Sequence, residues 1–462
     1  MSIFSGIANT VRRIFFPQAV AEREFGVLPA VSLTMEQHIA LWYAMLTNNP
    51  PWQNCNVKSV GLPAAICREV ARPALVEFTA SITGSDRAEY LDETFHTAAQ
   101  SFSRALEMGL ALGGVALKPY IYGDQLLVDI TGAAGFQPTK FDPSGRCICG
   151  VFRDKPARVN GKYYVRLEYH ELNKKTYTIR NKVYYSDATG TVGAEAPMDA
   201  VQEWAEIEKE VTIQDIDGPL FAYFKPPIAN TADTNSLCGM SIYGDAATVE
   251  LVKQADEQWE LLQWEFKSGE RKVLMDGNST TASMFDRRLF EIGAFSSEGN
   301  FYQFLNPDLR NDAIYKGFQD VLRRIEFTVG LSYGDISDPQ TVEKTATEIR
   351  SSKQRKYVLI NSIQTALEHT FDALIYAMDV YATLYNLAVD GEYEVTYDWG
   401  DSILDDQETK EKEFNRDLQL LNAGIMNDWE FRMKWMNEDE ATAKAALPKM
   451  QDMTDEPNTE TE

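Results

Sequence analysis

The sequence has few cysteines and no long apolar stretch. Its five cysteines are scattered and odd in number, which is typical of a reducing compartment and of a protein without a disulfide framework. No run of roughly 18 apolar residues occurs, so no membrane-spanning helix is expected. No secretory signal peptide with a cleavage site is recognisable. We therefore expect a protein that is made in the cytoplasm and does not enter a membrane.

The sequence also lacks the motifs of nucleotide hydrolysis and of metal binding. No Walker A or Gly-x-Gly-x-x-Gly pattern occurs. Cys147 and Cys149 alternate on a predicted strand, but no second pair of Cys or His accompanies them, as a zinc site would need. The four histidines show no metal-ligand spacing: they are His38, His96, His170 and His369. The 69 carboxylates make close pairs unavoidable by chance, so no pair indicates an acid–base role. We expect no enzymatic activity and no cofactor.

Basic residues are scarce compared with acidic ones. The 462-residue chain has 44 Lys and Arg against 69 Asp and Glu, a formal net charge of -25. An acidic surface repels phosphate, which disfavours a protein that grips DNA. It does not exclude a protein that encloses DNA without holding it. With 44% hydrophobic residues the chain can fill a large core, and its length predicts roughly two to four structural units.

Two amphipathic helices with a compact insert between them organise the chain. The first is predicted over residues 245–268, with Asp245 as N-cap and Gly269 as its end. Its apolar residues are three or four apart, which places them on one stripe: Val249, Val252, Ala255, Trp259, Leu262 and Phe266. Its carboxylates are expected on the polar side, which excludes a membrane span: Glu250, Asp256, Glu257, Glu260 and Glu265.

The second helix is predicted over residues 311–330, with Asn311 or Asp312 at its start and Gly330 at its end. Its apolar stripe has the same spacing: Ile314, Phe318, Val321, Leu322, Ile325 and Val329. The insert between the two helices alternates apolar and polar residues in the stretches KVLMDG, DRRLFEIGAF and FYQFLNP. This alternation predicts a small β or α/β unit of roughly 40 residues.

The part before residue 245 is predicted to be helical first and β-rich later. Helical spacing covers residues 35–46, 64–78 and 92–112. A hairpin over 115–130 turns at Gly123-Asp124, and Pro119 marks it as edge-like. An antiparallel meander over 147–187 is expected to turn at Asn160-Gly161, Asn173-Lys174 and Asn181-Lys182. Residues 221–246 form a long loop that leads into the first organising helix.

The termini and the part after residue 330 complete the prediction. Residues 1–17 are amphipathic, with Arg12 and Arg13, and suit a packing helix at a subunit contact better than a membrane surface. After the second organising helix comes a polar loop, 331–344, and a helix over 342–387. Next we expect a strand over 392–399 and acidic helices over 405–422 and 428–447. The tail over 451–462 is disordered by composition. The fold class is therefore α+β.

The order of these parts resembles a known family. A loop YFKPPIANTADTNSLCGMSIYGDA feeds a helix, and a second helix ends in GLSYGDISDPQTVEKTATEIRSS before a long helix. The carboxyl end, VTYDWGDSILDDQETKEKEFNRDLQLLNAGIMNDWEF, has an acidic D-S-I-x-D segment and an L-x-x-A-G-I turn. Over residues 25 to 450, this pattern resembles the portal proteins of tailed bacteriophages, in particular the branch with long flexible tails.

The resemblance implies a ring, usually of twelve subunits, at one vertex of the viral capsid, through which double-stranded DNA is packaged and ejected. Residues 1–244 and 342–397 then correspond to the wing, and 245–268 with 311–330 to the stem helices. Residues 269–310 correspond to the clip, 331–344 to the tunnel loop and 398–450 to the crown. Residues 1–17 depart from the family pattern.

The resemblance also implies partners and contact residues. In the tunnel loop, the residues expected around the DNA are Asp335, Asp338, Thr341, Glu343 and Lys344. The stem carboxylates named above become candidates for the channel lining. In the clip, the residues expected at oligomer or motor contacts are Phe285, Arg287, Arg288, Phe290, Phe301, Tyr302 and Phe304. The implied partners are further copies of the chain, the terminase large subunit, head–tail connector or adaptor proteins, and capsid and scaffolding proteins.

The implied location is the virion, after assembly in the bacterial host cytoplasm. Acidic walls suit a DNA channel, because every favourable phosphate contact would have to be broken as the DNA moves. Two alternatives stay open. A non-viral cytoplasmic scaffold built on helical hairpins fits the same periodicity, whereas a head-associated enzyme would need a metal or nucleophile constellation that the sequence does not show.

Overall fold

The computed structural model describes residues 25–26, 30–187, 193–269, 272–276, 289–292, 302–305, 308–339, 346–400, 407–436 and 438–446. The predicted segment 1–17 and the predicted tail 451–462 lie outside these residues. The chain divides into two units, Met1–Gly400 and Asp401–Glu462, and each is described by itself. Helices occur together with mainly antiparallel sheets, which confirms the α+β class.

Within the residues that the structure describes, four helices precede β2: α3 (Leu33–Leu46), α4 (Leu62–Leu75), α5 (Asp86–Ala99) and α6 (Phe102–Leu112). Ser32 and Ser85 cap α3 and α5, because each side chain accepts a hydrogen bond from a backbone N–H of the first turn. The single helix predicted over 92–112 is wrong, since the chain breaks at Gln100 and Ser101 between α5 and α6.

The predicted hairpin of the first β part is confirmed as β2 (Val115–Tyr122) and β3 (Gln125–Gly132), with Gly123 in the left-handed region at its turn. A third strand, β11 (Ala222–Phe224), pairs with β2 only along Val115–Leu117. Pro119 therefore lies where β2 has β3 as its only neighbouring strand, so its missing N–H removes no bond to β11.

The larger sheet is antiparallel throughout, in the order β10-β8-β7-β5-β4. Its strands are β4 (Phe136–Phe141), β5 (Cys147–Arg153), β7 (Lys162–Asn173), β8 (Thr176–Ser186) and β10 (Glu210–Ile213). The short strands β6 (Ala157–Val159) and β9 (Ala194–Ala196) pair with β7 and β8, and two single-turn helices, η2 (Met198–Ala200) and η3 (Gln202–Trp204), follow β9. The predicted meander is confirmed.

One predicted turn of the meander is wrong. Asn160 and Gly161 do turn the chain with positive φ, and so does Lys174. At Asn181-Lys182, however, β8 continues without a break and pairs with β7. Asn181 is buried, and its Nδ2 donates to the backbone carbonyl of Glu208 at 2.9 Å. The side chain that favoured a turn is thus satisfied by the chain beside it.

A buried charge network joins the two sheets. Glu168 on β7 accepts from Lys118 on β2 at 2.5 Å and from Arg166 at 3.0 Å, and His170 Nε2 lies 2.7 Å from its other oxygen. Burial alone would raise the pKa of Glu168, but the charges of Lys118, His170 and Arg166 outweigh burial and hold that pKa well below its usual range. Both carboxylate oxygens have partners, so the network is a structural cross-link.

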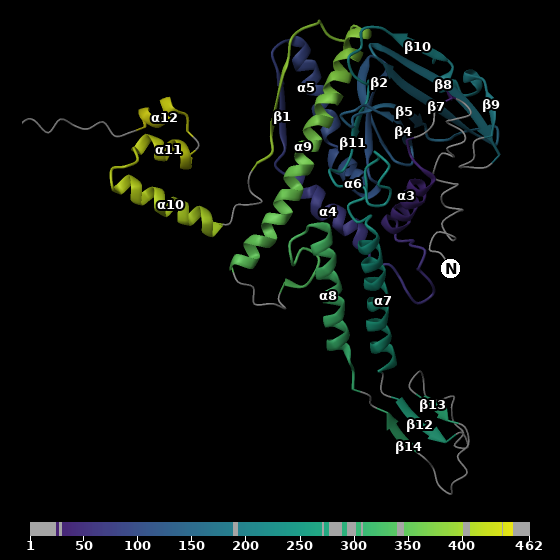
Figure 1. Cartoon of the computed structure of the whole chain (residues 1–462), viewed down its shortest axis with the longest axis vertical. Coiled ribbons are helices and arrows are strands. Elements are labelled where there is room, and N and C mark those ends of the chain that lie inside the picture. The colour runs from purple at the N-terminus through teal and green to yellow at the C-terminus, as the bar shows by residue number, and fades with distance from the viewer. Residues whose placement is uncertain are drawn as a thin grey trace, which may run out of the picture. The chain divides into compact units, whose positions relative to one another are not determined.

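The predicted organising helices are confirmed as α7 (Ala246–Ser268) and α8 (Asn311–Val329), which lie side by side and run antiparallel (Figure 1). Asp245 caps α7 as expected, accepting from Ala247 N at 3.0 Å. The predicted cap of α8 is wrong, because Arg310 occupies the N-cap position and makes no side-chain capping bond there. Gly330, with φ +90°, ends α8.

The described part of the insert between the two helices forms a three-stranded sheet. Its strands β12 (Lys272–Asp276), β13 (Leu289–Ile292) and β14 (Tyr302–Leu305) lie in the three stretches predicted to alternate. The order is β13-β12-β14, in which β13 is parallel and β14 antiparallel to β12.

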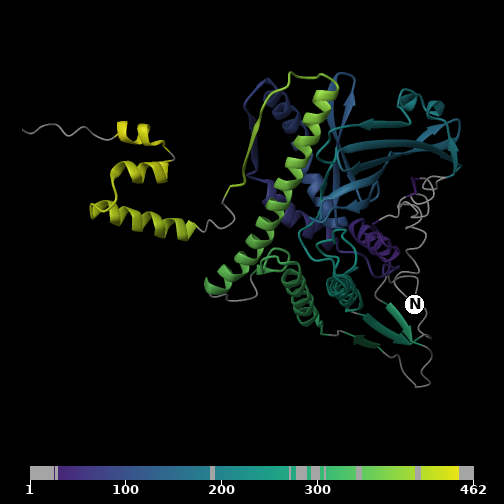
Figure 2. The same ribbon diagram turned by 45° about the horizontal axis from the view of Figure 1, so that its top comes forward.

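The long helix α9 (Ala346–Leu384) crosses the first unit and packs against α4, α5, β2 and β11 (Figures 1 and 2). Residues 342–345 of its predicted span lie outside the described residues. The predicted strand is confirmed as β15 (Glu394–Asp398), but its antiparallel partner β1 (Thr79–Thr83) was not predicted. Phe78 packs against Trp399 beside this pair, with ring centroids 4.4 Å apart.

The start of α7 is fixed to the helices of the body. Gly113, the C-cap of α6 with φ +83°, touches Gly239 so closely that a Cβ on either residue would collide with the backbone carbonyl of the other. Ile242 N donates to the carbonyl of Leu110 at 2.9 Å, and the Tyr243 hydroxyl donates to the carbonyl of Trp42 at 3.0 Å. The loop before α7 is therefore anchored to both α3 and α6.

The second unit contains α10 (Gln407–Asn422), α11 (Asp428–Met436) and α12 (Glu440–Ala445). The helix predicted over 428–447 is thus two short helices. Phe414 on α10 meets Trp435 on α11 edge to face at 5.2 Å, and Asp417 accepts from Lys434 Nζ at 2.6 Å. These contacts hold α10 and α11 together.

Candidate functional site

The helices α7 and α8 bury an apolar stripe against each other. Val252, Leu262 and Ile325 are buried between the helices, and the Trp259 ring lies 5.6 Å from that of Phe318. The expected stripe of α7 is confirmed over Val249–Ala255 and at Leu262. It is wrong at Phe266, which is 48% exposed.

Asp256 does not lie on the exposed side of α7 as predicted. It is 1% exposed, its Oδ2 accepts from Trp52 Nε1 at 2.8 Å and its Oδ1 from Val60 N at 2.9 Å. Burial raises the pKa of Asp256, and these two bonds counteract that rise only in part. The residue fastens α7 to the loop between α3 and α4.

Glu265 also departs from the prediction. It is 5% exposed and accepts from the backbone N–H of Arg310 and from its guanidinium Nη2, both at 3.0 Å. The bonds from Arg310 lower the pKa of Glu265. Glu265 therefore closes the end of the hairpin, just before the inserted sheet. Of the five predicted carboxylates, Glu250 and Glu257 are exposed and Glu260 is half-buried.

The outer side of α7 carries a stripe of exposed residues at helical spacing. Its members, here called the acidic stripe, are Glu250, Gln254, Glu257, Leu261 and Trp264. Leu261 is 42% exposed and Trp264 is 52% exposed. Two carboxylates and two large apolar side chains thus share one solvent-facing line.

The loop after α8 is built around one buried carboxylate. Glu326 is fully buried, and its Oε1 accepts from the backbone N–H groups of Gly334, Ile336 and Ser337 at 2.8–3.0 Å. Its Oε2 accepts from the Ser337 hydroxyl at 2.9 Å. Residues 331–339 are therefore fixed to the last turn of α8.

The predicted tunnel-loop residues divide into two groups. Asp335 pairs with Lys356 Nζ on α9 at 3.1 Å. Asp338 N donates to Gln319 Oε1 at 2.7 Å, and the Asp338 carboxylate accepts from the Tyr315 hydroxyl at 3.4 Å. Both aspartates are held against the helices. Thr341, Glu343 and Lys344 lie outside the described residues.

The predicted clip residues fall mostly outside the described chain. Phe285, Arg287, Arg288 and Phe301 are not among the described residues. The backbones of the other three lie in the inserted sheet: Phe290 pairs with Leu274, Tyr302 with Met275, and Phe304 with Val273.

A cluster of arginine and aromatic side chains lies where α8, the loop 331–339 and α9 meet. The guanidinium of Arg324 lies 5.2 Å from the centre of the Phe327 ring. The guanidinium of Arg355 lies 5.1 Å from the same ring and 4.8 Å from that of Tyr333. This cluster could not be predicted from the sequence, because its members come from three separate segments.

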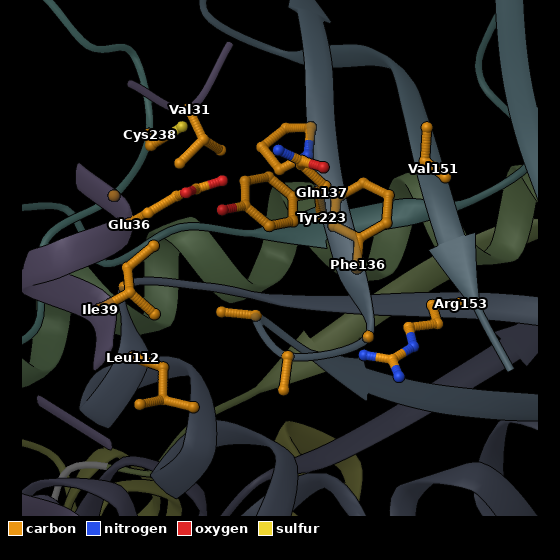
Figure 3. Close-up of a pocket in the computed structure, with 16 residues that line it drawn as sticks. Val31, Glu36, Ile39, Leu112, Phe136, Gln137, Val151, Arg153, Tyr223 and Cys238 are labelled. Carbon is orange, nitrogen blue, oxygen red and sulfur yellow. The ribbon is translucent and has the colours of Figure 1, made fainter. Parts of the chain in front are cut away.

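A small cavity lies between α3, the β3–β4 loop and β5 (Figure 3). Glu36 on α3 points into it and is 7% exposed, and burial raises its pKa to about 7. Among the described residues, Glu36 Oε1 and Gln137 Oε1 have no hydrogen-bond partner. The cavity measures about 30 Å³, room for only about one or two water molecules. It is too small for a substrate.

A larger groove of about 690 Å³ runs between α9 and the β4–β5 turn. The Tyr376 hydroxyl accepts there from the backbone N–H groups of Asp217 and Gly218. Cys147 in its wall is buried, and burial raises the pKa of its thiol well above the usual range, so the thiol is not a nucleophile. His369 lines the groove without a hydrogen bond to a nucleophile among the described residues.

Within the described ranges, no group of three or more His, Cys, Asp or Glu side chains is arranged to hold a metal ion. No helix that the structure describes is both long and apolar enough to cross a membrane. In comparisons with known proteins, no family model matches the chain and no curated protein is significantly similar to it.

Proposed function

We propose that this chain is a portal protein of a tailed bacteriophage, one subunit of a ring at a capsid vertex through which double-stranded DNA is packaged and ejected. One observation carries the proposal. The α7–α8 hairpin buries an apolar stripe between its helices, yet the solvent-facing line of α7 exposes Leu261 and Trp264. A long surface helix normally turns its polar side outward, so exposed large apolar residues indicate that neighbouring chains cover them.

The charge of the chain supports a conduit for DNA. The formal net charge is -25, which opposes stable binding of a polyphosphate. A ring of such chains would surround DNA while leaving it free to move. The order of loop, helix, β insert, helix and long helix adds support, because it resembles the family described above.

The proposal assigns partners by region. The inserted sheet β12–β14, at the end of the hairpin, would dock the terminase large subunit during packaging and head–tail connector or adaptor proteins afterwards. Other surfaces of the ring would contact capsid and scaffolding proteins. The mature protein would then reside in the virion, after assembly in the bacterial host cytoplasm.

Size-exclusion chromatography with light scattering tests the proposal on the purified full-length chain. We expect a closed assembly of roughly ten or more subunits, about twelve in the family pattern, with a central channel in electron micrographs. A monomer or dimer at micromolar concentration would contradict it. That outcome would favour a cytoplasmic scaffold built on helical hairpins.

A further inference from the structure

We infer that neighbouring copies of this chain join head to tail, with the acidic stripe of α7 packed against an arginine–aromatic face on α8, the loop 331–339 and α9 of the next copy. The inference rests on the proposed ring and deepens it, since it names the two surfaces that meet. The arginine–aromatic face consists of Arg324, Phe327, Tyr333, Arg355 and Val358.

The arginine–aromatic face has the composition of a protein contact. Phe327 is 48% exposed, Tyr333 is 36% exposed and Val358 is 59% exposed. Two guanidiniums stack on the aromatic rings among them. Aromatic and arginine side chains are enriched in the centres of protein interfaces. A patch of this kind on a chain of charge -25 favours an acidic, partly apolar partner.

The guanidinium of Arg355 is poised to receive such a partner. Its Nε is enclosed by the fold and has no hydrogen-bond partner among the described residues, so an approaching carboxylate can reach only the terminal nitrogens of the guanidinium. A guanidinium that lies beside aromatic rings can still bind a carboxylate through its terminal N–H groups. Arg324 is exposed and presents a second guanidinium beside the same Phe327 ring.

The acidic stripe supplies the matching chemistry. Glu257 is exposed and has no ion pair among the described residues. In the part of the chain that the structure describes, Glu250 pairs with Lys253 of the same helix at 3.1 Å, and an exposed pair of this kind contributes little. Leu261 and Trp264 continue the stripe with apolar surface toward the inserted sheet, level with the first two turns of α8 in the hairpin.

The two surfaces lie at matching levels of the hairpin. Because α7 and α8 are antiparallel and meet at Trp259 and Phe318, Glu250 lies level with Phe327. By the same register, Glu257 lies level with Asp320. Arg324 then falls between the two glutamates, about one helical turn from each. A rotation about an axis parallel to the hairpin keeps these levels, so it brings Arg324 of one copy between Glu250 and Glu257 of the next.

The two surfaces are different, so their pairing is heterologous. A heterologous contact repeats from copy to copy and closes into a ring when the rotation per step divides a full turn. An arginine-rich surface could also contact DNA phosphates. The three exposed apolar side chains on this face favour a protein partner, because phosphate contacts do not require them.

Charge reversal tests the pairing in the full-length chain. One variant carries Arg324→Glu and Arg355→Glu, a second carries Glu250→Lys and Glu257→Lys, and a third carries all four changes. We expect each double variant to lower the ring fraction about tenfold in light scattering. The fourfold variant should regain rings, because every interface then pairs reversed charges. A control with Lys155→Glu and Glu203→Lys, both exposed elsewhere, should assemble normally.

The outcomes separate this inference from the proposed function. If the natural chain forms rings and both double variants form them equally well, the pairing is wrong and the ring stands. If the natural chain forms no ring, the proposed function fails first. If the arginine variant keeps its rings but loses DNA translocation, the face belongs to DNA, which also overturns the pairing. Unchanged circular-dichroism melting shows that the double variants fold, and failure of the fourfold variant to recover would count against the pairing.

Discussion

At the scale of single residues, Glu36 is a buried carboxyl group whose ionisation affects folding near neutral pH. Burial raises its pKa from 4.5 to about 7. The folded chain therefore holds a proton that the unfolded chain loses between these pH values. At low pH the protonated Glu36 side chain therefore favours folding compared with the ionised one. This contribution to the free energy of unfolding is lost as the pH rises through about 7.

Replacing Glu36 with Gln should stabilise the chain at pH 8 and change little at pH 4. The amide keeps the shape of the acid and never carries the buried charge, so the gain above pH 7 is at most about 3 kcal/mol. Thermal melting of both proteins across this pH range measures the difference. Exposed Glu203→Gln serves as control. A difference that does not vary with pH would show that Glu36 does not titrate in this range.

Glu326, unlike Glu36, stabilises the fold through hydrogen bonds, because both of its carboxylate oxygens accept them. Glu326→Ala should leave three backbone N–H groups of the loop 331–339 without their acceptor, at a cost of roughly 3 kcal/mol. Glu326→Gln keeps one acceptor oxygen and should cost less. Chymotryptic cleavage after Tyr333 and the melting temperature measure the effect. If the alanine variant resists cleavage as well as the natural chain, the loop does not depend on this carboxylate.

At the scale of elements, the periodic stretches could be predicted and the long-range contacts could not. The α7 and α8 helices, the β2–β3 hairpin and the strands of the insert follow from local spacing. β1 has no comparable signal, since it forms by pairing with β15 more than 300 residues later. Asn181 is a residue type that favours turns, and only the folded structure shows that β10 and the backbone of Glu208 lie beside it.

In the candidate site too, local spacing could be predicted and long-range contacts could not. Helical spacing indicates which side of α7 is polar, but it does not show that another segment covers part of that side. Asp256 is buried by the loop that contains Trp52 and Val60, and Glu265 by Arg310. The exposure of Trp264 could be predicted neither from the apolar stripe nor from the charge pattern of α7. The arginine–aromatic face needs three segments to be folded together.

The inserted sheet can be tested as one element. We expect deletion of residues 272–308, with a short Gly-Ser link, to abolish ring closure or terminase docking while the hairpin itself survives. The contact between Glu265 and Arg310 remains in this variant and still closes the helix pair. Circular dichroism reports the helices, and light scattering with a terminase pull-down reports assembly. Normal rings that package DNA would contradict the assignment of this sheet.

At the scale of the whole molecule, the negative charge should keep DNA moving. Glu250 and Glu257 belong to the inferred contact between copies, so Glu260 is the remaining stem candidate for the channel wall. We expect Glu260→Lys to preserve rings and to slow DNA packaging, more strongly at low salt, where charges are screened less. An in vitro packaging assay at two salt concentrations measures this. Equal rates for this variant and the natural chain, with Glu203→Lys as control, would argue against a repulsive lining.

The anchoring of α7 has a mechanical consequence. The contact of Gly113 with Gly239, the bond from Tyr243 to Trp42 and the bonds of Asp256 to Trp52 and Val60 hold the first three or so turns of this helix to the body. The hairpin is therefore a cantilever that is clamped at one end. A load applied at its free end bends the stretch beyond Asp256 and passes its torque into α3 and α6 without a hinge.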